Sequence, residues 1–156
     1  MSFSGKTVMI SGGASGLGLL CGQCFSKEHA NIVLVDINKK ALDEKVAEIN
    51  LAGGKAMGIT ADIRDYSQVA TARDAAVAKF SSIDVMINCA GGAEMRMLKV
   101  QNQEFKDVPI EVFDWGIDVN LKGQFYFDHA VMKQMAEQNS GVIINIGSIT
   151  GEEGCS

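Results

Sequence analysis

The sequence has little of what marks secreted, membrane or nucleic-acid-binding proteins. No apolar stretch reaches the about 18–20 residues that a membrane span needs. The first residues lack the charged start and long apolar core of a secretory signal. Basic residues do not cluster, because Lys39-Lys40 is the only adjacent basic pair and the net charge is −5. A nucleic-acid footprint requires clustered Lys and Arg. We therefore expect a cytoplasmic protein with neither a nucleic-acid nor a membrane partner.

Proline and cysteine are also scarce. The 156 residues include one proline, Pro109, and four cysteines. Cys21 and Cys24 have the C-x-x-C spacing, for which a redox or metal role is the alternative reading. No second such pair and no histidine pair completes a zinc site, so we expect no metal. Both side chains are expected to face the sheet as small hydrophobes, with their thiols reduced.

Short apolar runs alternate with longer helical stretches along the whole chain. Strands are expected at 7–11, 31–36, 55–60, 83–88 and 142–146. Helices are expected at 16–29, from an Asn38 cap to Gly53, from Asp65 or Ser67 to about 80, and from about 112 to 137. Strands that are apolar on both faces and separated by helices indicate a parallel sheet covered on both sides. The sequence therefore predicts an α/β, Rossmann-type doubly wound parallel sheet of five strands in a single domain over 1–156.

Two stretches are less regular. Residues 92–110 have no clear pattern, and within them Gly92 to Met97 read as a loop or a short irregular segment. The helix expected over 112–137 carries an apolar face that includes four residues with a spacing of four: Phe113, Ile117, Leu121 and Phe125.

A glycine-rich turn follows the first expected strand and opens the first expected helix. Gly12, Gly16 and Gly18 have the spacing G-x-x-x-G-x-G, with Ser15 and Leu17 between them. Such glycines allow a sharp exit from the strand, close approach of a pyrophosphate, and tight packing of the helix on the sheet. The helix N-terminus then offers unpaired N–H groups to phosphates. The turn therefore predicts a dinucleotide site.

Asp36 ends the second expected strand, 18 residues after Gly18. A carboxylate at this place can accept hydrogen bonds from the adenosine ribose hydroxyls. A 2′-phosphate would be repelled there, by about 4 kcal/mol for each pair of unit charges at ~4 Å and an effective dielectric near 20. Ser15, Ile37 and Asn38 supply no basic side chain, and Lys39 is expected on the solvated face of the next helix. The sequence therefore predicts NAD rather than NADP.

Five features, in order along the chain, resemble the short-chain dehydrogenase/reductase family. They are the glycine turn, Asp62-Ile63 after the third strand, Asn88-Cys89-Ala90-Gly91, Asn120 in Asp118-Val119-Asn120, and Ser148 in Ile146-Gly147-Ser148. The resemblance implies that Asp62 and Ile63 contact adenine and that Asn88, Ala90 and Gly91 lie beside the cofactor. In structural terms, Asp62 is alternatively a helix N-cap, and Asn88 and Gly91 alternatively end a strand. The family pattern has a second asparagine where this chain has Cys89.

The resemblance also implies hydride transfer between nicotinamide and a secondary alcohol or ketone. Ser148 would hold the substrate oxygen, and Asn120 would position a water on the proton path. Asparagine is a poor helix former, so its presence at 120 fits a kink in the helix. A small-molecule alcohol or carbonyl compound is the expected substrate, and the full-length protein is expected to be a homo-oligomer, a dimer or a tetramer.

The family's Tyr-x-x-x-Lys pair, which follows the serine, does not occur within the 156 residues. Neither Tyr66 nor Tyr126 has a lysine four residues later. We therefore expect a cofactor-binding domain that is incomplete at its C-terminus and that has little activity by itself. The fifth strand is then expected to form an exposed apolar edge, which favours aggregation. The alternative is a non-catalytic NAD-binding fragment or pseudoenzyme.

Overall fold

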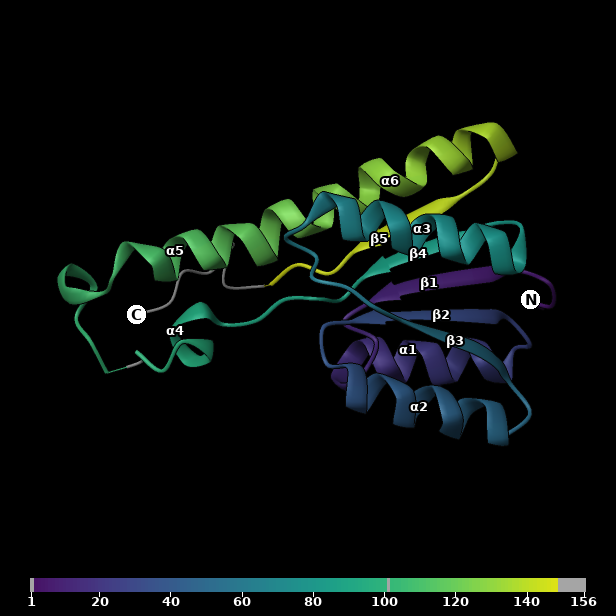
Figure 1. Cartoon of the computed structure of the whole chain (residues 1–156), viewed down its shortest axis with the longest axis horizontal. Helices are drawn as coiled ribbons and strands as arrows, with labels where there is room; N and C mark the ends of the chain where they lie inside the picture. The colour runs from purple at the N-terminus through teal and green to yellow at the C-terminus, as the bar shows by residue number, and fades with distance from the viewer. Residues whose placement is uncertain (1, 101, 149–156) are drawn as a thin grey trace.

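The computed structural model describes residues 2–100 and 102–148, which form one parallel sheet covered by helices (Figure 1). The strands are β1 (Thr7–Ser11), β2 (Asn31–Asp36), β3 (Lys55–Thr60), β4 (Val85–Asn88) and β5 (Val142–Asn145). They lie in the order β3-β2-β1-β4-β5, and every neighbouring pair is parallel. The predicted five-stranded parallel sheet is therefore confirmed, with four-residue fourth and fifth strands that are shorter than expected.

The helices cover both faces of this sheet. They are α1 (Gly16–Lys27), α2 (Lys39–Leu51), α3 (Tyr66–Phe80), α4 (Glu94–Met97), α5 (Ile110–Ile117) and α6 (Gly123–Gln138), with a π-helical turn at Asp118–Lys122 and a 3₁₀ turn at Phe105–Asp107. Figure 1 shows α1 and α2 on one side of the sheet and α3 and α6 on the other. This is the predicted doubly wound Rossmann-type arrangement.

Side-chain caps fix where two of the helices begin. Asn38 accepts a hydrogen bond from the Ala41 N–H at 3.1 Å and caps α2. Asp65, rather than Ser67, caps α3 by accepting the Ser67 N–H at 2.8 Å. Each cap satisfies a backbone donor that the first helical turn leaves unpaired.

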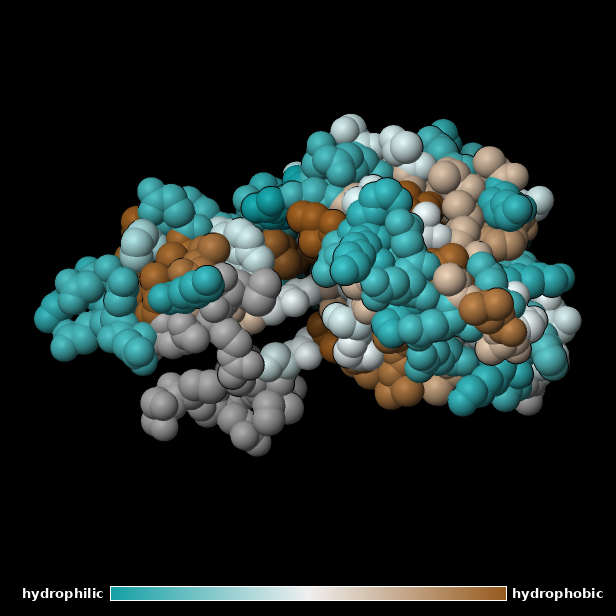
Figure 2. Space-filling view, turned by 60° about the horizontal axis from the view of Figure 1, so that its bottom comes forward, coloured by the Kyte–Doolittle hydropathy of each residue, from teal (hydrophilic) through white to brown (hydrophobic). Residues whose placement is uncertain are grey.

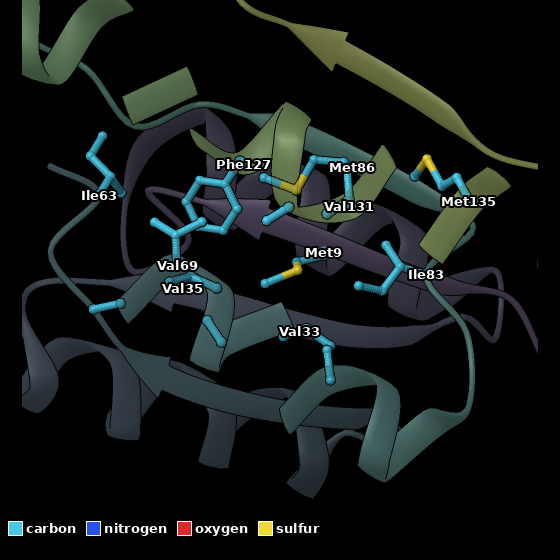
Figure 3. Packing of buried hydrophobic residues seen from close by; sticks show 14 residues of the cluster. Met9, Val33, Val35, Ile63, Val69, Ile83, Met86, Phe127, Val131 and Met135 are labelled. Carbon is cyan, nitrogen blue, oxygen red and sulfur yellow. The ribbon is translucent and has the colours of Figure 1, made fainter. Parts of the chain in front are cut away.

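Two apolar cores fill the space between the sheet and its helices. One lies between the sheet and α3 and α6, where Met9 and Val33 meet Val69 and Phe127 (Figure 3). The other joins Ile10, Leu34 and neighbouring side chains to α1 and α2. Alternate residues of β1 and β2 enter opposite cores, which is why these strands are apolar throughout.

The long helix expected over 112–137 is present, but the expected apolar face was wrong. Ile117, Leu121 and Phe125 are more than half exposed. The buried side instead includes Gly116, Gly123 and Phe127. The helix carries apolar residues on two sides, and the side with small residues packs on the sheet because it allows closer approach.

Two further expectations differ from the structure. Cys21 is half-buried, but Cys24 is exposed, so the expectation that both face the sheet was wrong for Cys24. Cys155 lies outside the described residues. The segment 92–110 includes the short helix α4 rather than loop alone. In the part of the chain that the structure describes, no helix is long and apolar enough to cross a membrane.

Candidate dinucleotide and substrate site

The glycine turn joins β1 to α1 at the carboxyl edge of the sheet. Gly12 and Gly16 have φ angles of +67° and +52°, a region that side chains disfavour. A Cβ on Gly12 would lie 2.9 Å from the backbone of Ala90, and a Cβ on Gly18 would lie in hard contact with the Gly12 carbonyl oxygen. The turn therefore excludes side chains at Gly12 and Gly18, because the backbone packs tightly there as it passes from β1 into α1.

The first turn of α1 presents backbone N–H groups and no acidic side chain. Ser15 is its N-cap residue, makes no side-chain cap hydrogen bond, and is exposed. Leu17, in the same turn, is about half exposed, at 49%. The helix dipole and the unpaired N–H groups favour an anion at this end. The predicted phosphate residues Ser15, Gly16 and Leu17 therefore lie together on an accessible helix N-terminus.

Asp36 lies at the end of β2, beside the glycine turn. One carboxylate oxygen accepts the Ala14 N–H at 3.0 Å, and the other accepts the Asn38 N–H at 2.9 Å. These two bonds fix the carboxylate, and each oxygen keeps a further lone pair for a ligand hydroxyl. Lys39 instead pairs with Asp43 at 2.7 Å on the exposed face of α2, as expected.

Asp62 and Ile63 follow β3 on the other side of this region. Arg64 donates to both oxygens of Asp62, with Nε at 2.9 and 3.1 Å and Nη2 at 2.5 Å. These bonds lower the pKa of Asp62 and raise that of Arg64. Ile63 is buried, and a Cβ on Gly123 would collide with its side chain at 2.6 Å. The segment is thus held against the start of α6.

A cavity of about 280 Å³ opens between these elements. It is lined by Gly12, Ser15, Asp36, Ile37, Ala61, Asp62, Ile63, Arg64, Ala90, Gly91, Trp115 and Val119. Six of the residues predicted to bind the dinucleotide outside the first turn of α1 therefore share one cavity. Arg64 and Trp115 were not predicted to line this cavity. The signals available in the sequence were spacings: Arg64 comes two residues after Asp62, and Trp115 comes one helical turn before Val119.

A polar row crosses the sheet at its carboxyl edge. Ser11, Asn88 and Asn145 are register partners on β1, β4 and β5. The Asn88 amide donates to Asn145 at 2.6 Å and to Asp128 of α6 at 2.7 Å, and Asn145 donates to the other oxygen of Asp128 at 2.9 Å. Asn88 is fully buried, so these bonds compensate its desolvation. They also tie β5, which leads to Ser148, to α6.

Cys89 and Ala90 continue from Asn88 into the site. The Ala90 N–H donates to the Ser11 hydroxyl at 3.2 Å. Cys89 packs beside Gly18, and burial together with the neighbouring Cys21 thiol raises its pKa to about 11. The Cys89 thiol is therefore neutral at ordinary pH.

Asn120 lies in the π-helical turn between α5 and α6, so the expected irregularity in the helix is present. Its side chain accepts the Gly92 N–H at 2.8 Å and donates to the Gly92 carbonyl at 2.9 Å. A Cβ on Gly91 would lie 2.9 Å from the Asn120 oxygen. π-helical turns are frequent at functional sites. The π-helical turn places the side-chain amide of Asn120 against the loop that follows β4.

A second cavity, of about 820 Å³, adjoins the first and shares Ala90 and Gly91 with it. Its lining includes Glu94, Asn120, Gln124 and Ser148. Ser148 and Asn120, the two predicted catalytic residues, therefore share this cavity. Among the described residues, neither tyrosine is part of its lining. Tyr66 and Tyr126 pack edge to face on each other, and the Tyr66 hydroxyl lies 2.8 Å from His129.

Within residues 2–100 and 102–148, no group of three or more His, Cys, Asp or Glu side chains could hold an ion.

A family model described as short chain dehydrogenase matches residues 6–156. The chain is 30% identical over 144 residues to a D-threitol dehydrogenase of Mycolicibacterium smegmatis, covering 92% of this chain and 53% of that protein. It is 33% identical over 153 residues to a 3-oxoacyl-(acyl-carrier-protein) reductase FabG of Thermotoga maritima, covering 97% and 58%. The chain thus spans about half the length of the curated relatives it matches.

A solved structure also matches this chain over nearly its whole length. The crystal structure of an NAD⁺-bound xylitol dehydrogenase superposes with a TM-score of 0.88 at 28% sequence identity. The match covers 99% of this chain and 57% of that one.

Proposed function

The chain belongs to the short-chain dehydrogenase family, and we propose that it is the dinucleotide-binding part of an NAD-dependent oxidoreductase. The reaction is hydride transfer between nicotinamide and the carbon of a secondary alcohol or ketone. The observation that carries this proposal is the pair of adjoining cavities, one containing Gly12 and Asp36 and the other Asn120 and Ser148. Ligands bind at this carboxyl edge in open α/β sheets.

The residues present fit the dinucleotide. The tight turn at Gly12 and Gly18 brings the N-terminus of α1 to the end of β1, Gly16 has open space beside it, and this N-terminus favours the pyrophosphate. Asp36 would accept hydrogen bonds from the adenosine ribose. Asp62 and Ile63 would contact adenine, with Asn88, Ala90 and Gly91 shaping the wall beside them. When bound, the nicotinamide supplies or accepts the hydride.

Two residues would act on the substrate side. The Ser148 hydroxyl would hold the substrate oxygen. Asn120 fixes Gly92 through two hydrogen bonds and so keeps the loop after β4 in place. In our proposal this loop borders the substrate, and Asn120 also positions a water for proton transfer. General acid–base catalysis contributes typically about 10²–10⁴-fold, and its source in the family is the Tyr-x-x-x-Lys pair that residues 1–156 lack.

The choice of NAD over NADP rests on Asp36. Its carboxylate is fixed by the Ala14 and Asn38 amides, so it cannot turn away from a 2′-phosphate without losing both bonds. Arg64 is the basic residue in the cavity lining, and its guanidinium is engaged by Asp62. Repulsion of several kcal/mol before screening supports at least about a tenfold preference for NAD.

Calorimetric titration with NAD and NADP tests this assignment. We expect NAD to bind at least about tenfold more tightly, and Asp36→Asn to narrow the difference. Asp43→Asn, on the exposed face of α2, is the matched control and should leave the ratio unchanged. Equal affinities in the unchanged protein would overturn the cofactor assignment.

A non-catalytic NAD-binding protein is the second candidate. It is favoured by the engagement of Tyr66 and Tyr126 with each other, since neither tyrosine lines the cavity that contains Ser148. Formation of reduced nicotinamide with a panel of polyols, including threitol and xylitol, separates the two. Turnover supports the oxidoreductase, whereas binding without turnover of any panel member supports the second candidate.

We also propose that the full-length protein forms a homo-oligomer, a dimer or a tetramer. The support is the exposed apolar row along α5 and α6, formed by Ile117, Leu121, Phe125 and Met132. Figure 2 shows brown, apolar surface on the part of the molecule that projects from the sheet. Exposed contiguous apolar surface commonly marks a protein interface. Sedimentation of the full-length protein at several concentrations tests this, and a monomer throughout would contradict it.

A further inference from the structure

We propose that Trp115 forms an aromatic wall of the adenine subsite and stacks on the base of the bound dinucleotide. This inference rests on the proposed function and adds a cofactor-binding residue outside the glycine turn and the acidic positions. Trp115 is the only tryptophan in the sequence. It lines the cavity of about 280 Å³ that also includes Asp36 and Asp62.

The size of this cavity fits one part of a dinucleotide. Whole ligand pockets typically have volumes of about 300–1,000 Å³. A space of about 280 Å³ suits a single base with part of its ribose. The second cavity, of about 820 Å³, has room for the remainder and the substrate. The smaller cavity also contains Asp36, the predicted ribose partner, so the group beside Asp36 is the adenosine end.

Two of the cavity's walls come from segments far apart in the sequence, and the ends of β1, β2 and β4 supply the rest. The connection between β3 and α3 supplies residues 61–64, and the α5 helix with its π-helical turn supplies Trp115 and Val119. Trp115 and Val119 are four residues apart, so they lie on the same helical face. The two segments lie close together, because Ile63 packs on Gly123 and the charge of the Asp118 carboxylate raises the pKa of Arg64. Trp115 therefore borders the same ligand space as Asp62 and Ile63.

A cavity with an aromatic wall suits a flat heterocycle. An indole has a large π face, and aromatic pairs prefer offset-stacked or edge-to-face arrangements. Trp115 is half-buried, so part of its surface remains available to a ligand. Stacking of a base on an aromatic side chain changes affinity by about five- to a hundredfold when the side chain is truncated.

The single tryptophan makes the contact directly observable. We expect its emission to change when the protein is titrated with NAD or ADP-ribose, both of which carry adenine. Nicotinamide mononucleotide, which lacks adenine, should leave the emission unchanged at any concentration. Emission that responds equally to nicotinamide mononucleotide, or not at all to ADP-ribose at saturation, would overturn the proposal.

Substitution gives a second, independent readout. Trp115→Ala should weaken ADP-ribose binding by about tenfold in calorimetry, and Trp115→Phe should restore most of the affinity. Ile110→Ala is the matched control, because Ile110 lies on the same helix, is exposed, and does not line the cavity. If Trp115→Ala unfolds, the emission titration and Trp115→Phe still decide the question.

Failure of this inference is distinguishable from failure of the proposed function. Calorimetry on the unchanged protein that shows no NAD binding contradicts the proposed function itself. NAD binding with a silent tryptophan, and with unchanged ADP-ribose affinity in Trp115→Ala, contradicts only the role of Trp115.

Discussion

The two sides of the sheet around β1 differ sharply in how well they are covered. On one side, β1 and β2 lie between helices on both faces, and Val8, Ile10, Ile32 and Leu34 are fully buried. We refer to β1, β2, α1 and α2 as the closed half. On the other side, β5 has Val142 at 54% and Ile144 at 40% exposure, and α5 and α6 carry the exposed apolar row. We refer to β5, α5 and α6 as the open half.

This difference shows that an apolar pattern indicates that a strand can be buried, and not that it is buried. The runs Thr7–Ser11 and Val142–Asn145 have the same apolar character. Among the described strands, β1 has a neighbour on each edge and β5 pairs only with β4. An exposed apolar edge strand also offers unpaired backbone groups to other chains. The closed half should therefore determine the stability of this chain, and the open half should determine its association.

Truncation of one apolar side chain in each half should give the largest difference between the halves. Leu34→Ala should lower the free energy of unfolding by about 2–5 kcal/mol, because Leu34 is fully buried and its atoms contact Gly13 and Gly22. Ile144→Ala should cost about 1 kcal/mol or less, because Ile144 is 40% exposed. Denaturant titration measures both.

For association, which light scattering measures, Ile144→Ala should have a larger effect than Leu34→Ala. Ile144→Ala removes apolar surface from the exposed edge, so it should reduce association at equal protein concentration. Equal losses of stability in the two variants would abolish the distinction between the halves.

Glycine substitutions sharpen the contrast at the site itself. Gly18→Ala should cost about 1–3 kcal/mol, because its Cβ would collide with the Gly12 carbonyl, a backbone atom that cannot move without opening the turn. It should also remove measurable NAD binding. Gly147→Ala, in the chain after β5, has open space around its Cβ and should change the unfolding free energy by about 0.5 kcal/mol or less. Denaturant titration and calorimetry distinguish the two, and a Gly18→Ala variant with unchanged NAD affinity would exclude a tight turn at the pyrophosphate.

The sequence predicted the closed half better than the open half for a physical reason. In β1, β2 and β3 the expected limits match the structure residue for residue, since local turn and cap signals such as Asn38 bound each element. In the long helix, the period of the pattern identified an apolar row but not which of two rows packs on the sheet. That choice depends on Gly116 and Gly123 meeting other elements, which is a tertiary contact.

The candidate site divides in the same way. Gly12, Asp36 and Asp62 could be found because each directly follows a strand, where parallel strands bring their ends together. The sequence shows the spacing of Arg64 from Asp62 and of Trp115 from Val119, but it does not show that these side chains reach the same cavity, which depends on tertiary packing. The two hydrogen bonds between Asn120 and Gly92 are likewise contacts between segments 28 residues apart.

The smallest expected effect concerns the thiol of Cys89, which lies where α1 of the closed half meets the candidate site. Its pKa is raised from 9.0 to about 11 by burial and by the Cys21 thiol, so the folded state favours the neutral thiol. Only the thiolate reacts with iodoacetamide, and at pH 8 a shift of two units leaves about a hundredfold less of it. Cys24, which is exposed, should therefore be alkylated first. The Cys89 rate should then rise about tenfold per pH unit until pH approaches 11.

The sign of the linkage follows from the same shift. A raised pKa in the folded state means that the stabilising contribution of the Cys89 thiol is complete below pH 9.0 and is lost as pH rises toward about 11. Mass spectrometry of peptides after timed alkylation at several pH values measures both cysteines in one sample. A Cys89 rate that levels off near pH 9 would show that its surroundings are as wet as those of an ordinary thiol. Cys89 would then be a solvated part of the larger cavity, which it lines together with Asn120 and Ser148.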